Sequence, residues 1–245
     1  MEQNNAFKVL AEQLSISNKK AKTLIDRGLV YVGQNKVKIA RALINEDTKF
    51  RVENVADIKI LYEDEDIIAV DKPAFLDSYD VQDSIENSEL LHRLDRDTSG
   101  VLLLGKNEKF IKKAVEEFRN RRVKKIYTAW VEGVFFEETI IDAPIHTIKR
   151  GKAISKIDER IGKKAITKVT PLEIQGKKSK VLIEIGTGRT HQIRVHMSHI
   201  GHPVVGDELY GSRTKSSRIL LHSKQISIFK YSFEAREPKE ILKYK

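Results

Sequence analysis

The sequence predicts an α+β fold in two parts, a small domain over residues 1–55 and a larger one over residues 56–245. In the first part, apolar residues at helical spacing are followed by short extended runs. From about residue 57, apolar runs of strand length alternate with helical segments. A chain of 245 residues is long enough to bury a substantial core in one or two domains.

Composition limits the partners and the chemistry. The chain carries 45 Lys and Arg against 35 Asp and Glu, a net charge of +10, which favours a polyanionic partner such as nucleic acid over an anionic membrane surface. Cysteine is absent, so disulfides, thiolate zinc sites and cysteine nucleophiles are excluded. The start of the chain has no apolar signal core and no run reaches the length of a membrane span, so we expect a soluble, cytoplasmic protein.

The first part predicts two helices and a hairpin. Apolar spacing indicates a helix around residues 7–14. Ser17 is expected to cap a second helix that Gly28 ends. Residues 29–32 then predict a strand, followed by a turn and another extended piece.

The same part is basic. Residues 1–53 hold ten Lys and Arg and six Asp and Glu, a net charge of +4. The cations on or beside the second helix are candidate phosphate contacts, namely Lys19, Lys20, Lys22 and Arg27. An ordinary solvated helix face is the alternative.

The second part begins with two strands. Apolar runs at residues 58–62 and 67–70 enclose four consecutive acids, Glu63 to Asp66. A polar hairpin turn explains the acids better than a metal site, because no glycine-bearing loop of ligand spacing follows. Pro73 stops the second strand, and residues 77–90 indicate a polar loop or a short helix.

An amphipathic helix over residues 110–118 precedes a basic run and a strand. Cations complement the end of a helix, but the density of charge here exceeds that need, so an RNA backbone contact is favoured for Arg121, Arg122, Lys124 and Lys125. Residues 123–131 predict a strand in which Tyr127 alternates with apolar residues, and the residue pattern by itself favours a core aromatic there. Residues 142–165, polar and basic, predict long exposed connections.

The densest cluster of charge lies in residues 93–97, which hold two carboxylates and two guanidiniums. A turn at residues 98–100 follows, and then an apolar run at 101–104 that predicts a buried strand. Neighbouring positive charge stabilises an ionised carboxylate. A fixed, ionised carboxylate suits nucleophilic or glycosyl chemistry. A structural salt-bridge cluster at a strand end is the alternative.

A second constellation spans residues 186–196. Gly186 and Gly188 hint at a phosphate loop, but the next position of a dinucleotide fingerprint is His191, so that motif fails. Nearby histidines, at 191, 196, 199 and 202, lack acidic or thiolate companions, which disfavours a metal site. The pattern instead predicts a strand, a glycine turn and a helix capped by Thr190. Arg189, at the junction, is expected to reach a buried carboxylate from another strand.

These segments resemble a known family. Residues 92–100, 127–129 and 188–196 are similar to the three signature motifs of the RluA-type RNA pseudouridine synthases, and residues 201–207, 209–211 and 71–73 extend the match. The resemblance covers roughly residues 58–245. Residues 1–55 resemble the small RNA-binding domain named after the fourth small-subunit ribosomal protein. The chain departs from the family at residues 74–76, where a small-residue turn is usual, and in the short segment between Pro73 and His92.

The resemblance implies a role for each matched residue. Asp95 would be the catalytic aspartate, and Arg189 would pair with it and orient it. Tyr127 would stack on the target base and assist proton removal from its C5. Arg93 would hold the RNA around the extracted nucleotide, and Arg194 is a further expected RNA contact. Asp97 would have a structural or RNA-positioning role.

The resemblance also implies a fold, partners and a substrate. The expected fold is a mixed, largely antiparallel central sheet with helices and loops around a cleft. No metal or organic cofactor and no obligate protein partner are expected. Large-subunit ribosomal RNA is the favoured substrate, because members with the extra domain often act there, and transfer RNA is the alternative. A non-catalytic RNA-binding or ribosome-assembly protein, a base glycosylase and a methyltransferase remain as competitors, the last weakened by the failed glycine fingerprint.

Overall fold

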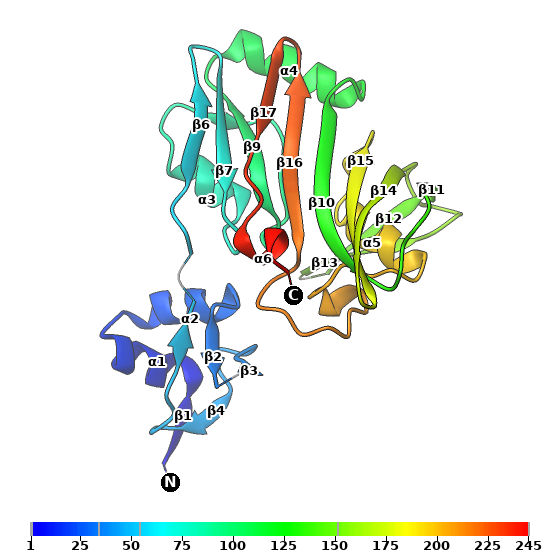
Figure 1. Ribbon diagram of the computed structural model, residues 1–245. Helices are drawn as coiled ribbons and strands as arrows, with labels where there is room; N and C mark the ends of the chain where they lie inside the picture. The colour runs from blue at the N-terminus through cyan, green and yellow to red at the C-terminus, as the bar shows by residue number, and fades with distance from the viewer. Residues whose placement is uncertain (1, 34, 54, 151, 245) are drawn as a thin grey trace. The chain divides into compact units, whose positions relative to one another are not determined.

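The computed structural model describes residues 2–33, 35–53, 55–150 and 152–244. The chain divides into two compact units, residues 1–56 and 57–245 (Figure 1). The sequence pattern placed the division between residues 55 and 56.

The described residues of the first unit form two helices and five short strands. They are β1 (Gln3–Asn5), α1 (Ala6–Leu14), α2 (Asn18–Asp26), β2 (Val30–Val32), β3 (Asn35–Lys36), β4 (Leu43–Asn45) and β5 (Arg51–Val52). Strand β1 pairs with β4, and β2 lies between β3 and β5. The hydroxyl of Ser17 accepts a hydrogen bond from the Lys20 amide at 3.2 Å, so the predicted cap of α2 is confirmed. Phe7, Leu10 and Ile25 bury one face of each helix in a common core.

The second unit is built on one large sheet. Its strands are β6 (Lys59–Glu63), β7 (Ile67–Lys72), β8 (Glu89–Leu90), β9 (Ser99–Gly105), β10 (Lys124–Glu132), β11 (Thr139–Asp142), β14 (Ile166–Gln175), β15 (Lys178–Ile185), β16 (Leu221–Ile228) and β17 (Tyr231–Glu234). The order is β11-β14-β15-β10-β16-β9-β7-β6, with β17 on β16 and β8 on β9 (Figure 1). Among the described strands only β9 and β16 pair in parallel. The predicted mixed, largely antiparallel sheet is confirmed.

Helices cover both faces of the sheet. They are α3 (Ser78–Asp83), α4 (Glu108–Arg119), α5 (Gln192–His199), the 3-10 turn η1 (Glu208–Tyr210) and α6 (Lys239–Leu242). On one face Val81 of α3 and Met197 of α5 pack on the core, and on the other Phe110 of α4 does so. Burial on both faces explains why β7 and β9 read as continuous apolar runs instead of alternating ones.

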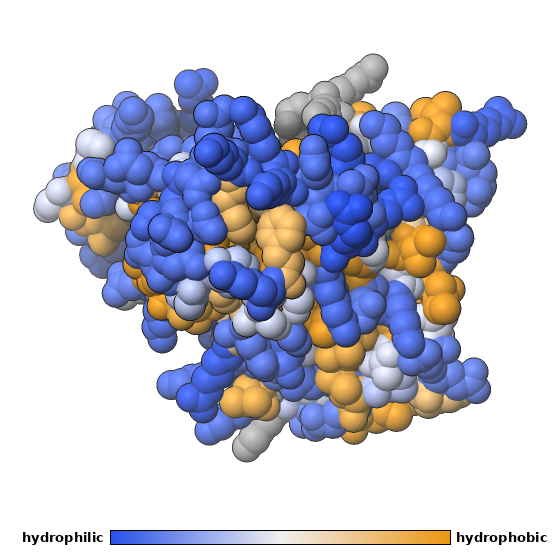
Figure 2. Space-filling model, turned by 90° about the horizontal axis from the view of Figure 1, so that it is seen from above, coloured by the Kyte–Doolittle hydropathy of each residue, from blue (hydrophilic) through white to orange (hydrophobic). Residues whose placement is uncertain are grey.

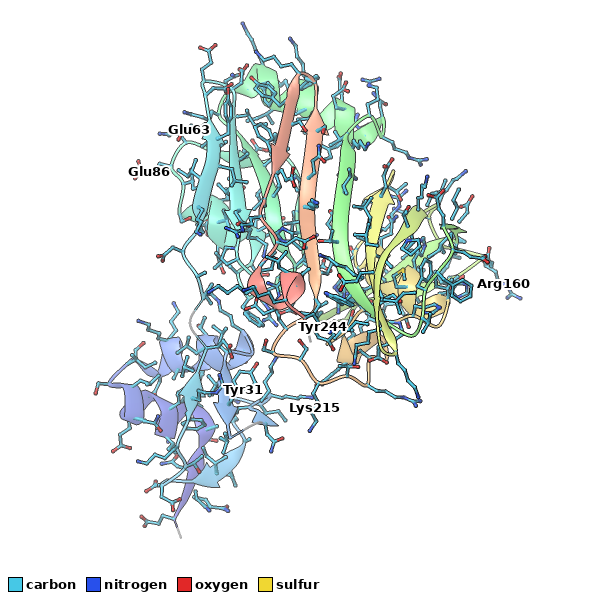
Figure 3. All side chains as sticks on the ribbon, in the orientation of Figure 1. Tyr31, Glu63, Glu86, Arg160, Lys215 and Tyr244 are labelled. Carbon is cyan, nitrogen blue, oxygen red and sulfur yellow. The ribbon has the colours of Figure 1, made fainter. Side chains whose placement is uncertain are left out.

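Residues 142–165 do not form the exposed connections that their polarity predicts. They contain a hairpin of β12 (Ile145–Arg150) and β13 (Lys152–Ile157). Ile145 and Ala165 are buried against Val195 of α5. A few apolar residues suffice because the hairpin buries only one side, while Arg160, beyond its end, projects to solvent (Figure 3).

The turn predicted at residues 98–100 is also wrong, because Ser99 and Gly100 already belong to β9. Gly100 has φ +110°, and a Cβ atom there would lie 2.1 Å from the carbonyl oxygen of Ser223. Glycine therefore permits the close approach of β9 and β16 at their parallel pairing. This pairing places the start of β16 beside the charged segment that precedes β9.

The face seen in Figure 2 is mostly hydrophilic, with hydrophobic side chains in separate patches. None of the helices in the described ranges is both long and apolar enough to span a membrane.

Candidate active site

The segment before β9, residues 92–98, is held in place by hydrogen bonds from its neighbours. Nε2 of His92 accepts from the Leu103 amide at 3.2 Å. The hydroxyl of Ser78 donates to the carbonyl oxygen of Leu94 and accepts from its amide, both at 3.0 Å. The backbone on both sides of Arg93 is therefore fixed to β9 and α3.

The carbonyl oxygens that follow Asp95 face two buried cations. Nζ of Lys72 donates to the carbonyl oxygens of Arg96, Pro73 and Leu76. The guanidinium of Arg218, just before β16, donates to the carbonyl oxygen of Asp97 at 3.4 Å and to the Ser99 hydroxyl at 2.8 Å. The segment carrying Asp95 is thus clamped from β7 on one side and from β16 on the other.

Residues 74–76, where the chain departs from the family, take part in the same clamp. Phe75 is buried and its amide donates to the carbonyl oxygen of Arg96 at 2.8 Å. Although these residues differ from the turn that is usual in the family, they support the charged segment.

The carboxylate of Asp95 pairs with Arg194 on α5. The distance from Nη1 of Arg194 to Oδ2 of Asp95 is 3.3 Å. The other side of the guanidinium makes a two-pronged pair with Asp207, at 2.6 and 2.9 Å. Asp95 is 28% exposed, whereas the Arg194 and Asp207 side chains are 7% and 1% exposed. Although burial opposes its charge, the bonds and charge of Asp207, with those of Asp95, raise the pKa of Arg194, so it is a permanent cation.

The expected pair of Asp95 with Arg189 is wrong. Nε of Arg189 donates instead to the carbonyl oxygen of Lys164 at 3.2 Å. Both arginines lie in the same motif, but the turn before α5 aims Arg189 toward Lys164, just before β14. Arg194, in the first turn of α5, faces the carboxylate. Arg194, which was also an expected RNA contact, has a buried side chain that is 7% exposed.

The turn into α5 differs from the predicted capped helix. Thr190 does not cap it, and His191 occupies the N-cap position with a left-handed backbone, φ 56°. Oε1 of Gln192 accepts from the Arg189 amide at 3.1 Å and from the Thr187 hydroxyl at 2.7 Å. Gln192 thereby fixes the turn that leads into α5.

His191 and Tyr210 extend the site. Nδ1 of His191 lies 2.8 Å from the hydroxyl of Tyr210, and its Nε2 lies 3.8 Å from Oδ2 of Asp95. The Tyr210 ring also covers the Arg194 guanidinium, at 4.9 Å. Tyr210 therefore contacts both residues that face the carboxylate.

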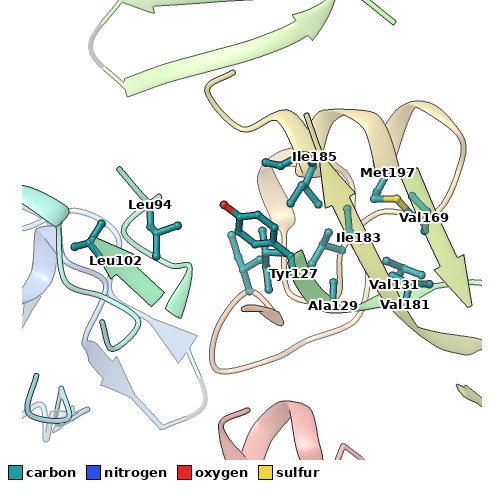
Figure 4. Close-up of a cluster of buried hydrophobic side chains, with 14 of the residues drawn as sticks. Leu94, Leu102, Tyr127, Ala129, Val131, Val169, Val181, Ile183, Ile185 and Met197 are labelled. Carbon is teal, nitrogen blue, oxygen red and sulfur yellow. The ribbon is translucent and has the colours of Figure 1, made fainter. Parts of the chain in front are cut away.

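Tyr127 lies on β10 and belongs to the core cluster that reaches the site. Figure 4 shows its ring between Leu94 and the β15 residues Ile183 and Ile185, with the hydroxyl on the Leu94 side. Burial, with a smaller contribution from the charge of Asp95, raises the pKa of Tyr127, so the phenol is neutral near pH 7.

These groups line a cavity of about 80 Å³. Its lining includes Arg93, Asp95, Tyr127, Arg189, His191 and Arg194. The cavity combines a fixed, partly exposed carboxylate, an aromatic ring and hydrogen-bond donors. Such a set can attack or stabilise an electrophilic carbon while it holds a planar base.

The candidate RNA contacts of the second unit differ in exposure. Arg93 is exposed and its guanidinium lies 5.6 Å from the ring of Tyr79, itself 56% exposed. Arg121, Arg122 and Lys124 are exposed, with Arg122 paired to Glu117 and Lys124 to Glu184.

Lys125 is not a surface contact. It is buried and its Nζ donates to the carbonyl oxygen of Thr187 at 3.3 Å, so it supports the turn before α5. In the first unit, Lys19 and Lys20 are exposed, Arg27 is half-buried, and Lys22 lies over the Phe7 ring at 4.2 Å.

The histidines of the second motif are dispersed. Both ring nitrogens of His196 have partners, the Thr167 hydroxyl and the Ala143 carbonyl oxygen. His202 bonds to the carbonyl oxygen of Glu132, and His199 is exposed.

Sequence reasoning missed Asp207, Tyr210, Ser78 and Arg218 as site residues. Asp207 and Tyr210 lie within segments noted only as extensions of the family match. A buried arginine needs a carboxylate, so an acid in the matched segment after α5 was the available signal for Asp207. Arg218 and Ser78 carry no local signal, because their role depends on packing against a distant loop.

The chain is similar to known RNA pseudouridine synthases. The family model described as RNA pseudouridylate synthase matches residues 66–199. An uncharacterized RNA pseudouridine synthase of Helicobacter pylori (strain J99) is 48% identical over 237 residues, covering 96% of this chain and 98% of the relative. A ribosomal large subunit pseudouridine synthase D of Pasteurella multocida is 31% identical and covers 81% of this chain and 70% of its own.

A solved structure shows the same fold. Human RNA pseudouridylate synthase domain containing 1 has a TM-score of 0.65 at 29% identity, covering 78% of this chain and 86% of that chain. The matched segment contains the clamped aspartate, the buried tyrosine and the arginine of α5 described above. The chain therefore belongs to the RluA-type family of RNA pseudouridine synthases.

Proposed function

We propose that this chain converts uridine to pseudouridine in large-subunit ribosomal RNA, with Asp95 as the catalytic nucleophile. The observation that carries the proposal is the Asp95 carboxylate, held by a buried arginine at the wall of a cavity that also contains Tyr127. The ribosomal substrate is supported by the Pasteurella multocida relative, which is named for the large subunit.

The reaction moves the uracil on its ribose. The bond from C1′ to N1 breaks, a bond from C1′ to C5 forms, the hydrogen at C5 leaves as a proton and N1 gains one. An ionised carboxylate can trap or stabilise the sugar carbon in between, as in retaining glycosidases. Arg194 orients the Asp95 carboxylate through its Nη1, while Asp207 holds the other side of the guanidinium.

The target base must leave its stack to reach the cavity, at a cost of a few kcal/mol. Tyr127 is proposed to stack on it, and the exposed Arg93 to contact RNA at the mouth of the cavity. The Tyr127 phenol is neutral, so it can take up the C5 proton only if it passes its own hydroxyl proton to another acceptor. Lys19, Lys20, Lys22 and Arg27 of the first unit are proposed to bind RNA phosphates.

The experiment is tritium release from RNA labelled at C5 of uridine. Unmodified large-subunit, small-subunit and transfer RNA transcripts are each incubated with wild type and with Asp95→Asn. Release from the large-subunit transcript, by wild type alone, is expected. Release from transfer RNA alone would replace the proposed substrate, and equal release by Asp95→Asn would remove Asp95 as nucleophile. No release from any transcript would favour the non-catalytic RNA-binding alternative.

A further inference from the structure

We propose that His191 contacts the substrate, donating a hydrogen bond from Nε2–H to a carbonyl oxygen of the extracted uracil. This inference rests on the proposed role of Asp95. The His191 side chain is 14% exposed and lines the cavity beside Asp95 and Tyr127. It has no assigned part in the reaction described above.

The position of the imidazole proton follows from its neighbours. The Ser155 amide on β13 can only donate, so the Tyr210 oxygen accepts its bond, at 2.9 Å. The phenol then gives its own proton to Nδ1 of His191, 2.8 Å away. The opposite arrangement would leave the Tyr210 proton with no acceptor among the described residues. A neutral imidazole has one proton, which is therefore on Nε2.

That donor is available to a ligand. Among the described residues Nε2 has no hydrogen-bond partner, and Oδ2 of Asp95, 3.8 Å away, lies beyond hydrogen-bond distance. His191 lines the cavity in which the base is proposed to lie. A spare, oriented donor next to the nucleophile is suited to bind the substrate.

The backbone conformation of His191 also favours a functional role for this residue. His191 has φ 56° and ψ 21°, a left-handed conformation that costs energy for most residues other than glycine. The strain is retained because Gln192 and Tyr210 hold the turn on both sides. It places the imidazole between Tyr210 and the Asp95 carboxylate.

Four charged side chains lie around His191: Asp95 and Asp97 before β9, Arg194 on α5, and Asp207 before η1. Tyr210 on η1, which is neutral, also contacts the imidazole. Burial lowers the pKa of His191, with the charge of Arg194 in the same direction and the carboxylates opposed. The imidazole is therefore neutral near pH 7.

A hydrogen-bond donor beside the base can stabilise the charge that develops during the reaction. Uracil has two carbonyl oxygens, and the base gains negative charge on them when its bond to C1′ breaks. A donor that is already oriented stabilises such charge more in the transition state than in the ground state. His191 thus acts on the base while Asp95 acts on the sugar.

The first test needs no RNA, so it is independent of the substrate assignment. Long-range 15N–1H NMR of histidine-labelled protein at pH 7.5, assigned with His191→Gln, reports which ring nitrogen carries the proton. We expect Nε2–H with an unprotonated Nδ1. A protonated Nδ1, alone or in an imidazolium, would overturn the inference.

The second test measures single-turnover tritium release and RNA affinity on a transcript that wild type modifies. His191→Ala should slow release about 10- to 100-fold with RNA affinity within about 2-fold. His191→Gln, whose amide nitrogen can take the place of Nε2–H, should retain a rate within about 5-fold of wild type. Release by Tyr210→Phe should be faster than release by His191→Ala and slower than release by His191→Gln. His199→Ala, which changes an exposed histidine at the other end of α5, is the matched control.

Two kinetic outcomes contradict the inference: wild-type release by His191→Ala, or release by His191→Gln as slow as by His191→Ala. If His191→Ala does not fold, the His191→Gln and Tyr210→Phe variants still decide between a donor and a merely structural histidine. Wild-type release with an inactive Asp95→Asn shows that the proposed function stands even where the His191 contact fails.

Discussion

The cations around Asp95 and the cations on α2 differ in how tightly they are held. Arg194 is buried and shared between two carboxylates, and Lys72 donates to three carbonyl oxygens. Lys19 and Lys20 are exposed, and their ammonium groups have no hydrogen-bond partner among the described residues. The first set fixes the segment that carries Asp95, while the second is exposed and is proposed to follow an RNA backbone.

The difference predicts two kinds of mutational effect. A change in the buried set should act on the chemical step or on folding, because each group has one geometry and an unpaired partner is costly. A change in the exposed set should act on RNA binding, in proportion to the charge removed and to the salt concentration.

The largest effect is expected for Asp95→Asn. Loss of the anion should reduce single-turnover tritium release by more than about 10³-fold, while RNA affinity stays within about 2-fold, because few phosphate contacts are lost. Asp97→Asn is the matched control, since Asp97 is also a partly exposed carboxylate of the same segment. It should keep most of the activity, and an equal loss in both variants would contradict a special role for Asp95.

Arg194→Met tests the pair of Arg194 with Asp95, which the structure shows in place of the expected pair of Arg189 with Asp95. It leaves the buried Asp207 carboxylate unpaired, so the free energy of unfolding should fall by about 3 to 5 kcal/mol, and release should slow at least about 100-fold at a temperature where the variant is folded. Arg189→Met removes one bond to a carbonyl oxygen and should cost less than about 1.5 kcal/mol. A larger loss of turnover from Arg189→Met than from Arg194→Met would reverse the assignment.

Acid should destabilise the second unit through His92. Burial, with the charge of Lys125, lowers the pKa of His92 to about 3. Between this value and the pKa of about 6.5 in the unfolded chain, only the unfolded chain binds the proton. The free energy of unfolding therefore falls as the pH drops below 6.5, by about 2 kcal/mol at pH 5 from this residue.

The measurement is urea unfolding at pH 7.5 and 5, followed by the fluorescence of Trp130, the single tryptophan of the chain. His222, whose pKa burial lowers to about 4, acts with the same sign. His92→Asn should therefore reduce the pH dependence without removing it. An unchanged pH dependence in this variant would show that His92 is not the group that titrates.

The smallest effect is expected on the first unit. Lys19→Ala with Lys20→Ala should weaken RNA binding about 5-fold at moderate salt and reduce the slope of log affinity against log salt by about two. Release at saturating RNA should be unchanged. Lys109→Ala with Lys113→Ala, exposed on α4, is the charge-matched control, and an equal loss there would mean that net charge alone determines binding.

Sequence reasoning succeeded where a feature is local. The Ser17 cap, the polar turn between β6 and β7 and the buried strand β9 each depend on residues a few positions apart. The family motifs likewise identified the segments that meet at the cavity. The hairpin of β12 and β13 was missed because its apolar residues are few and pack on a distant helix.

The sequence by itself determined the fold class, the family and the segments that carry the site, since hydrophobic periodicity and motif spacing are written along the chain. Only the tertiary structure decided which arginine meets Asp95. Arg189 and Arg194 are chemically equal and five positions apart, so the choice depends on the turn into α5 and on Asp207 behind the guanidinium. The same holds for Lys72, Tyr210 and Arg218, whose partners are far away in sequence and are brought near only by the packing of the sheet.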